Sequence, residues 1–482
     1  MKRLSLWMLA AVTGLAACSG SEDSGPLAPA EPELRFGSPN VIWVTNSNDG
    51  GAGSFRAAVQ RANASRSVKR IEFVRGLGSI PLASPVVYTG EQALDIRASG
   101  TTLDGSGLGA TDPAAFLANG GGDLTVVGLN VRNAPQEGLT VQVPASATGT
   151  QKVSLINCEI VGNMGHGVLI NDQVDPEDTD NSAGSAASVD VTVVSCRFAD
   201  NGFGALDRDG LRINEGGDGH LLAQLSLVQA DHNGADGIEF DERGPGDVRF
   251  YVSATHVTRN GSYDQTLADL DDGFDVDEAD EGDLIAKVIL SSANDNYEEG
   301  FDFNENHEGD FKVEMTLVEA SRNLEEGIDF EEDDDFQGGG DLITTLIAVK
   351  ANGNGPGGDA GLKIRERGDG SIDATVKGAE TNDNQIGGIE IREDAAGDLR
   401  ASVERAVALR NVEDGIKFDE NGDGELIATL KHSNSSNNGE AGVAAEQQSP
   451  GAGLLDVIKT LLNGNTGGPI DANSGVVVTQ KP

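Results

Sequence analysis

The sequence predicts an all-β fold, a single-stranded parallel β-helix (solenoid) with about 27 residues in each coil. Three observations lead to this prediction. A glycine followed by an apolar, a polar and an apolar residue recurs nine times, at spacings of 27, 36, 27, 27, 34, 27, 27 and 27 residues. Within each copy, apolar and polar residues alternate with the period of two that is typical of strands. An asparagine ends every copy, which gives the repeat a fixed frame.

The copies share their first and last residues. The glycines are Gly210, Gly237, Gly273, Gly300, Gly327, Gly361, Gly388, Gly415 and Gly442. The asparagines are Asn233, Asn260, Asn296, Asn323, Asn354, Asn384, Asn411, Asn438 and Asn465. Weaker copies begin at Gly138 and Gly167. We therefore expect regular coils over residues 138–482, each packed on its neighbours, after an N-terminal cap and first coils over residues 41–137.

One copy serves to place the strands. In the copy that begins at Gly273, Phe274 and Val276 point inward and the intervening aspartates point outward. A second inward set follows at 284–288 and a third at 291–293, which gives three short strands in each coil. The closing asparagine suits a tight corner, where stacked amides hydrogen-bond from coil to coil.

The N-terminal segment predicts a cap for this solenoid. Ser54 is a good helix N-cap, and Phe55, Ala58, Val59 and Ala62 fall on one face of the short helix that follows it. Such a helix covers the open end of the first coil. With this opening segment, from Val44 to Phe73, the repeats resemble the right-handed parallel β-helix (pectin-lyase-like) superfamily over roughly residues 41–478.

The first residues predict export. Lys2 and Arg3 precede an apolar run that ends in Leu15-Ala16-Ala17-Cys18. This run resembles the lipobox of bacterial lipoproteins, which implies a signal peptide over residues 1–17 and lipidation of Cys18. Residues 18–40 have the composition of a flexible tether. The resemblance implies an extracytoplasmic lipoprotein, anchored in the outer membrane or at the cell surface. An ordinary secretory signal is the alternative.

The charge of the chain limits its partners. With 34 basic and 79 acidic residues, the formal net charge is −45. Nucleic-acid binding needs a basic patch, and anionic lipid also attracts basic segments, so we expect neither partner. Membrane attachment would come only through the lipid anchor. Divalent cations are the partners expected for such a chain.

The acidic residues fall in columns. Outward positions on the first strand carry acids in successive copies, and a glutamate stands five residues after each glycine. Like charges on neighbouring strands repel by about 1 kcal/mol per pair unless a cation lies between them. Carboxylates in this arrangement suit Ca²⁺. The candidate ligands are Asp275, Asp277, Glu278, Asp302, Glu305, Asp329, Glu331 and Glu332. The alternative is a solvated acidic face that serves solubility.

Insertions and cysteines complete the candidate features. Extra residues at 202–209, 261–272, 355–360, 171–188 and 333–340 flank the acidic strand, and we expect them to wall a groove. Cys158 and Cys196 each lie five residues before an asparagine, so they stack inward on adjacent coils. The sequence leaves open whether they form a disulfide.

Three functions remain open from the sequence. The first is a non-catalytic surface protein that binds cations and an extracellular polysaccharide or cell-surface partner. The second is a calcium-dependent polysaccharide lyase or glycosidase acting on acidic polysaccharide, in which Lys363 or Arg365 beside the acidic strand would be the base. The third is a structural spacer. Gly165-His166-Gly167 resembles a motif of related hydrolases, but the motifs that accompany it there are absent, and we expect His166 in a turn where Asp209 and Asp236 stand in later coils.

Overall fold

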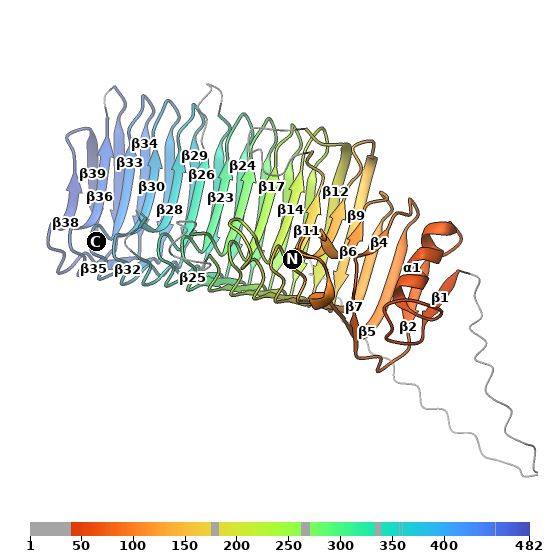
Figure 1. Ribbon diagram of the computed structural model, residues 1–482. Helices are drawn as coiled ribbons and strands as arrows, with labels where there is room; N and C mark the ends of the chain where they lie inside the picture. The colour runs from red at the N-terminus through yellow and green to blue at the C-terminus, as the bar shows by residue number, and fades with distance from the viewer. Residues whose placement is uncertain are drawn as a thin grey trace, which may run out of the picture. The chain divides into compact units, whose positions relative to one another are not determined.

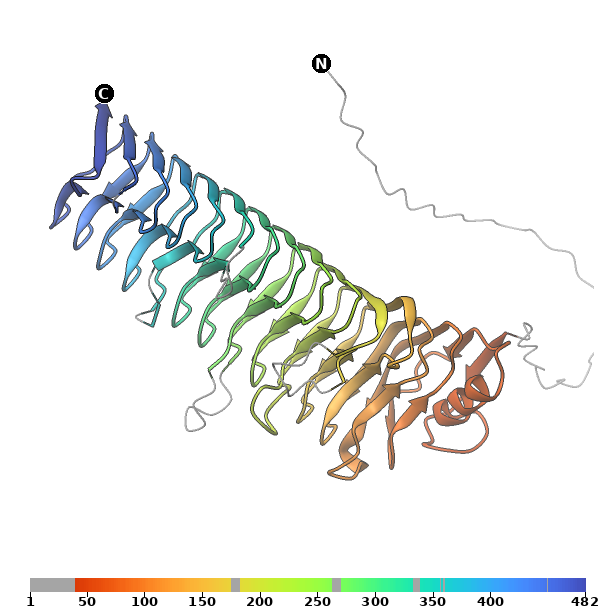
Figure 2. The same cartoon turned by 90° about the horizontal axis from the view of Figure 1, so that it is seen from above.

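The structure, a computed structural model, describes residues 40–174, 183–261, 270–332, 339–355, 357–358, 360–448 and 450–482. The predicted signal peptide, Cys18 and nearly all of the predicted tether lie outside the described residues. Within them the chain is a parallel β-solenoid of about 27 residues per coil, as predicted. Figures 1 and 2 show its coils stacked along one axis, with the α-helix at the N-terminal end. Among the described residues, no helix is both long and apolar enough to cross a membrane.

The first strand of each coil belongs to a 14-stranded sheet, which we call the first sheet. Every one of its strand pairs is parallel, and the register is continuous from coil to coil; for example, Asp275 lies opposite Asp302 and Asp302 opposite Asp329. Its strands are β4 (Val86–Tyr88), β6 (Ala114–Ala118), β8 (Glu137–Gln142), β11 (Val168–Asn171), β14 (Leu211–Glu215), β17 (Ile238–Glu242), β20 (Phe274–Glu278), β23 (Phe301–Glu305), β26 (Ile328–Glu332), β28 (Ala360–Glu366), β30 (Gly387–Glu393), β33 (Ile416–Glu420), β36 (Ala441–Gln447) and β38 (Gly468–Ala472).

The second and third strands join into the other faces of the solenoid. The early strands are β1 (Val41–Val44), β2 (Arg70–Phe73), β3 (Ser79–Pro81), β5 (Leu94–Asp104) and β7 (Leu124–Arg132). The second strands are β9 (Thr148–Ile156), β12 (Ala186–Val194), β15 (Leu221–Ser226), β18 (Val248–Ser253), β21 (Leu284–Ile289), β24 (Phe311–Thr316), β27 (Leu342–Ile347), β29 (Ile372–Lys377), β31 (Leu399–Glu404), β34 (Leu426–Lys431), β37 (Gly453–Ile458) and β39 (Val476–Lys481). The third strands are β10 (Glu159–Val161), β13 (Arg197–Ala199), β16 (Gln229–Asp231), β19 (His256–Thr258), β22 (Ser292–Asn294), β25 (Glu319–Ser321), β32 (Val407–Leu409) and β35 (Asn434–Ser436).

The core is a narrow column of apolar side chains that runs through all coils. Phenylalanines of the first sheet stack inside it, with Phe303 and Phe330 at a ring-centroid distance of 5.6 Å. The helix α1 (Phe55–Ala64) covers the N-terminal end of this column. Its N-cap is Ser54, whose hydroxyl oxygen accepts a hydrogen bond from the backbone N–H of Ala57 at 3.2 Å. Its four buried residues are those predicted from the sequence.

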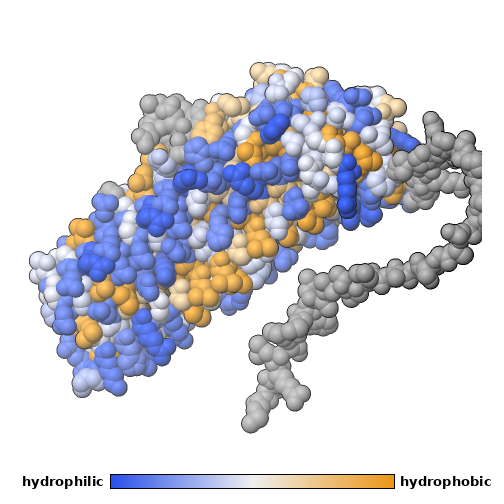
Figure 3. All heavy atoms as spheres, turned by 90° about the horizontal axis from the view of Figure 1, so that it is seen from below, coloured by the Kyte–Doolittle hydropathy of each residue, from blue (hydrophilic) through white to orange (hydrophobic). Residues whose placement is uncertain are grey.

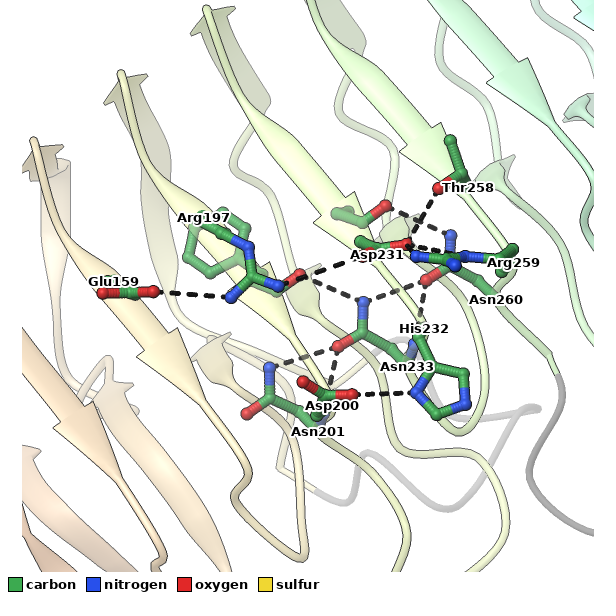
Figure 4. Close-up of polar contacts among 12 residues, drawn as sticks. Glu159, Arg197, Asp200, Asn201, Asp231, His232, Asn233, Thr258, Arg259 and Asn260 are labelled. Atoms are coloured by element: carbon green, nitrogen blue, oxygen red, sulfur yellow. Dashed lines mark hydrogen bonds and ion pairs between the residues drawn. The ribbon is translucent and has the colours of Figure 1, made fainter.

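The closing asparagines form the predicted ladder. Asn233 donates from Nδ2 to Oδ1 of Asn260 at 2.9 Å, and the backbone N–H of Asn233 donates to the same oxygen at 3.0 Å. Figure 4 shows three rungs, Asn201, Asn233 and Asn260, each from a successive coil. The ladder satisfies buried polar groups at a corner where no sheet ladder can do so.

A second corner, between the first and second strands, depends on glycine. A Cβ added to Gly424 would lie 1.6 Å from the carbonyl oxygen of Gly397 one coil below. Gly246, Gly282 and Gly309 meet the same restriction in earlier coils. Because parallel strands stack at about 4.8 Å, the corners approach each other too closely for any side chain.

Cys158 and Cys196 are buried and free. They face each other on adjacent coils, as the sequence predicts, and the backbone N–H of Cys158 contacts Sγ of Cys196 at 3.4 Å. Outside the core, the surface is mainly hydrophilic with scattered apolar residues on the face that Figure 3 shows.

Candidate cation site

The outward acidic residues of the first sheet lie in register on neighbouring strands. Glu239 on β17 is opposite Asp275 on β20, and the column continues through Asp302 on β23 to Asp329 on β26. Period-two alternation places all four side chains on the outer face. Asp275 and Asp302 are partly exposed, while Glu239 and Asp329 are buried. The sequence therefore located this column correctly.

A second acidic column occupies the corner just before the glycine of each coil; the sequence interpretation placed Asp209 and Asp236 in this turn but did not predict them as ligands. The column comprises Asp209, Asp236, Asp272, Glu299 and Glu326. Oδ1 of Asp236 accepts a hydrogen bond from the backbone N–H of Asp272 at 2.6 Å, and Oδ1 of Asp272 accepts from Glu299 N–H at 2.7 Å. These contacts fix one carboxylate oxygen in the corner and leave the other for the adjacent column. The recurrence of an acid at this one position was visible in the sequence.

The two columns converge on one region of the sheet. Asp272, Asp275 and Asp302 each offer a carboxylate oxygen, and the three atoms lie within 4.8 Å of one another. Asp236 and Glu239 form a similar group with Asp275. Asp272 also groups with Glu298 and Glu299. We call the contiguous set Asp236, Asp272, Asp275, Glu299 and Asp302 the central acidic strip.

Cationic side chains bound the strip at both ends. Arg212 on β14 is buried and lies 2.8 Å from Oε1 of Glu239 and 3.4 Å from Oδ2 of Asp241. At the other end, Nζ of Lys363 on β28 lies 2.8 Å from Oδ2 of Asp329. Among the described residues, no Lys or Arg ion pair is seen for any member of the strip itself. The middle of the acidic surface is thus the part with uncompensated charge.

Burial and mutual repulsion perturb the strip. Burial, followed by the charges of Asp302 and Asp275, raises the pKa of Asp272 well above its usual value. Burial and the neighbouring carboxylates Asp277 and Asp302 raise the pKa of Asp275 in the same direction. The ionised strip is therefore costly without a counter-ion, and either protons or cations must relieve it.

The donor set is chemically selective. All groups of three or more potential ligands found among the described residues consist of carboxylates. Oxygen-only sites suit hard cations, and Ca²⁺ accepts six to eight oxygens in irregular geometry, whereas Zn²⁺ favours nitrogen and sulfur. The residues present thus fit Ca²⁺ better than a transition metal.

The other predicted ligands lie elsewhere. Asp277 is opposite Asp241 and Asn304 in a parallel outward column, and burial raises its pKa to about 6. Asp329 and Glu331 both contact Lys363. The remaining three predicted ligands are fully buried on the inward side of the corner that follows the strand; they are Glu278, Glu305 and Glu332. Of the predicted ligands, the structure places Asp275 and Asp302 in one group, whereas Asp329 lies opposite Asp302 but is paired with Lys363.

The residues proposed for lyase chemistry are held in ion pairs. Nζ of Lys363 is close to Glu331 as well as to Asp329, and 3.8 Å from Oε1 of Glu326. Burial acts to lower the pKa of Lys363, but the neighbouring carboxylates outweigh it and raise that pKa above its usual value. Nε of Arg365 donates to Oδ2 of Asp394 at 2.7 Å.

The predicted groove is described only in part, since residues 175–182, 262–269 and 333–338 lie outside the described residues. One cavity of about 170 Å³ is seen beside Arg212, lined by Glu137, His166, Leu169, Asp207, Arg208, Arg212 and Asn214. His166 occupies the same corner position as Asp209, one coil closer to the N-terminus. Its Nδ1 accepts a hydrogen bond from the backbone N–H of Asp209 at 3.0 Å. This cavity is smaller than usual ligand pockets.

Comparison with known proteins gives matches among solved structures only. No protein-family model matches the sequence, and no curated protein matches it. Among solved structures, the periplasmic alginate epimerase AlgG is similar at 12% identity, over 83% of this chain and 78% of that one, with a TM-score of 0.38. The A-module of the Azotobacter vinelandii mannuronan C-5 epimerase AlgE4 is similar at 11% identity, over 90% and 97%, with a TM-score of 0.40. Tailspike protein 3 of bacteriophage CBA120 is similar at 11% identity, over 91% of this chain and 61% of that one, with a TM-score of 0.43. The predicted fold is confirmed by the structure of this chain itself, which is a parallel β-solenoid of about 27 residues per coil.

Proposed function

We propose that this protein is an extracytoplasmic, lipid-anchored β-helix that binds divalent cations, Ca²⁺ above all, on the central acidic strip. One observation carries the proposal. Asp272, Asp275 and Asp302 place carboxylate oxygens within 4.8 Å of one another between two ends that are already neutralised by Arg212 and Lys363. A merely solvated acidic face has no reason to concentrate uncompensated charge in one place.

Because the strip is partly exposed, a cation bound there can bridge the protein and an outside ligand. Asp275 and Asp302 retain contact with solvent, so a cation held there keeps coordination positions for outside ligands. Carboxylates of an acidic extracellular polysaccharide, or of a cell-surface protein, are suitable ligands for those positions. Without the cation, the same surface repels an acidic partner.

The lyase alternative meets a chemical obstacle at Lys363. A general base must be unprotonated at the working pH. Three carboxylates surround the Lys363 ammonium and favour its charged form. Arg365 is committed to Asp394. We therefore favour cation binding, with Lys363 as a structural counter-ion, over proton abstraction by either residue.

The test is a calcium titration of the purified protein by isothermal calorimetry, with thermal unfolding measured in parallel. The test variant carries Asp272→Asn, Asp275→Asn and Asp302→Asn. The control carries Asp369→Asn, Asp373→Asn and Asp423→Asn, three exposed aspartates outside the strip with the same total charge change. We expect wild type and control to bind Ca²⁺ and to gain thermal stability, and the test variant to lose at least tenfold in affinity. Equal binding by all three proteins, or none by wild type, would reject the strip as the site.

A further inference from the structure

A column of glutamates runs inside the corner between the first and second strands. Each member ends its strand of the first sheet, shares the inward side with the core residues two and four positions before it, and is completely buried. We call this column the glutamate ladder. Its members are Glu215, Glu242, Glu278, Glu305, Glu332, Glu366, Glu393 and Glu420. In the next coil Gln447 lies opposite Glu420.

The C-terminal members show the local chemistry away from the central acidic strip. Oε1 of Glu393 accepts a hydrogen bond from the backbone N–H of Ala395 at 2.7 Å, and Oε1 of Glu420 accepts from Gly422 N–H at 3.0 Å. Oε2 of each is buried, and with every carboxyl ionised it finds no hydrogen-bond donor among the described residues. The two carboxyls lie within hydrogen-bonding reach of each other.

Among the described residues, the groups seen in contact with this pair carry no positive charge. Glu393 meets the carboxyls of Glu366 and Glu420 and the backbone N–H groups of Ala395 and Gly397. Glu420 meets Glu393 and the backbone N–H groups of Gly422 and Leu399. Two carboxylates in contact in a dry corner repel strongly, whereas a carboxylic acid donates its O–H to a neighbouring carboxylate oxygen. One proton therefore removes the repulsion and satisfies the unpaired oxygens at once.

Gln447 provides an independent indication. Its amide has the shape of a protonated glutamate and carries no charge. Oε1 of Gln447 accepts from the backbone N–H of Leu426 at 2.7 Å, and its Nε2 donates to the carbonyl oxygen of Gly424 at 3.1 Å. The corner therefore accepts a neutral side chain that both donates and accepts.

We propose that Glu393 and Glu420, at the C-terminal end of the glutamate ladder, hold one proton between them at neutral pH, so that the stability of the solenoid falls as the pH rises. This proton is a structural ligand of the fold, separate from the cations proposed for the outer face.

The direction of the pH effect follows from the two states of the chain. Burial and the charge of Glu393 raise the pKa of Glu420 from 4.5 to about 9. Folded protein therefore retains a proton that the unfolded chain releases, between pH 4.5 and about pH 9. Across this window the folding equilibrium constant falls about tenfold per pH unit for each retained proton. Below pH 4.5 the protonated Glu420 contributes its full stabilisation to the folded state.

The first experiment is infrared spectroscopy of the wild-type protein in D₂O between pH 5 and 9. A protonated carboxyl has a C=O stretch separate from that of a carboxylate. We expect the protonated band to persist at pH 7.5 and to weaken in the variant Glu393→Gln/Glu420→Gln. A control, Glu425→Gln/Glu446→Gln, changes two exposed glutamates and should keep the band of the wild type. Absence of the band in wild type at pH 7.5 would overturn the proposal.

The second experiment is chemical unfolding of the same three proteins from pH 5 to 9. In the test variant, we expect the folding equilibrium constant to fall less steeply with pH than in wild type. The difference should be about tenfold per pH unit, because one shared proton is removed. The variant should be at least as stable as wild type at pH 8. An unchanged slope, or a test variant more than tenfold less stable than the control at pH 8, would contradict proton sharing. Metal retained after chelation in wild type and lost in the test variant would assign the ladder to a cation instead.

Discussion

Nζ of Lys363 lies 2.8 Å from Oδ2 of Asp329 on the neighbouring strand, and both side chains are almost fully buried. Lys363 also approaches Glu331 and Glu326, and Arg367 adds a second cation 2.8 Å from Glu331, so the C-terminal end of the acidic surface is neutralised. The central acidic strip, which lacks such a counter-ion among the described residues, therefore lies on the N-terminal side of this ion pair.

The first prediction concerns this counter-ion. Lys363→Gln removes the ammonium that faces the buried carboxylates of Asp329 and Glu326, and removing one partner of a buried ion pair costs about 3–5 kcal/mol of unfolding free energy. We expect a loss of this order in chemical unfolding at pH 7. Because the change extends the uncompensated strip, Ca²⁺ should restore more stability to the variant than to wild type. Lys377→Gln, at an exposed position of β29, is the control and should stay within about 0.5 kcal/mol of wild type. A loss equal to that of the control would show that the pair contributes little.

The second prediction concerns the asparagine ladder. Oδ1 of Asn296 accepts from both the backbone N–H and Nδ2 of Asn260, each at 3.1 Å. Asn296→Ala leaves two buried donors without partners, and each unsatisfied group costs about 1–3 kcal/mol. We expect a loss of about 2–4 kcal/mol in chemical unfolding. Asn465→Ala in the more exposed last rung should cost clearly less. Equal losses would mean that burial of the rung does not matter.

The third prediction concerns the glycine corner. A Cβ at Gly424 would lie 1.6 Å from the carbonyl oxygen of Gly397, which cannot move without breaking strand pairing. Gly424→Ala should therefore cost more than about 3 kcal/mol and lower the yield of soluble protein. Gly50→Ala, where no atom lies within 4 Å of the added Cβ, is the control. A normal melting temperature for Gly424→Ala would refute the close approach of the corners.

The sequence predicted the fold in detail because a solenoid repeats one local pattern. The glycine frame, the period of two and the closing asparagine each gave an element that the structure contains. The capping helix followed from Ser54 and four apolar residues, because a short amphipathic helix is a local feature. Stacking one coil on the next then places Asp275, Asp302 and Asp329 in register without any further information.

The candidate site was predicted only in part, for two physical reasons. Corner residues such as Asp272 lie outside the strand, so strand alternation does not say where their side chains point. Glu278 presents the opposite case, because counting by two from Phe274 places it inward, and the structure buries this predicted metal ligand. Complete burial of a glutamate is rare, so its charge alone gives no sign that it lies inside the corner.

The fourth prediction uses a buried acid at the N-terminal end of the regular coils. Burial raises the pKa of Asp172 from 3.8 to about 6, although Ser185 donates hydrogen bonds to both of its oxygens. Stability from the protonated form is complete below pH 3.8 and is lost as the pH rises to about 6. Asp172→Asn should therefore reduce the difference in unfolding free energy between pH 4 and pH 7 by about 2 kcal/mol. Asp373→Asn, at an exposed position, should leave that difference unchanged.

A fifth prediction tests the proposed anchor, which depends on Leu15-Ala16-Ala17-Cys18. If Cys18 is lipidated, cells that express the full chain and are fed an alkyne-bearing fatty acid should label the protein, and fractionation should place it with membranes. Cys18→Ser should abolish labelling, because the variant lacks the thiol that would carry the lipid. Cys158→Ser is the matched control, since this thiol is buried in the core, and it should keep the label. Wild-type protein that is exported without label would instead indicate an ordinary secretory signal.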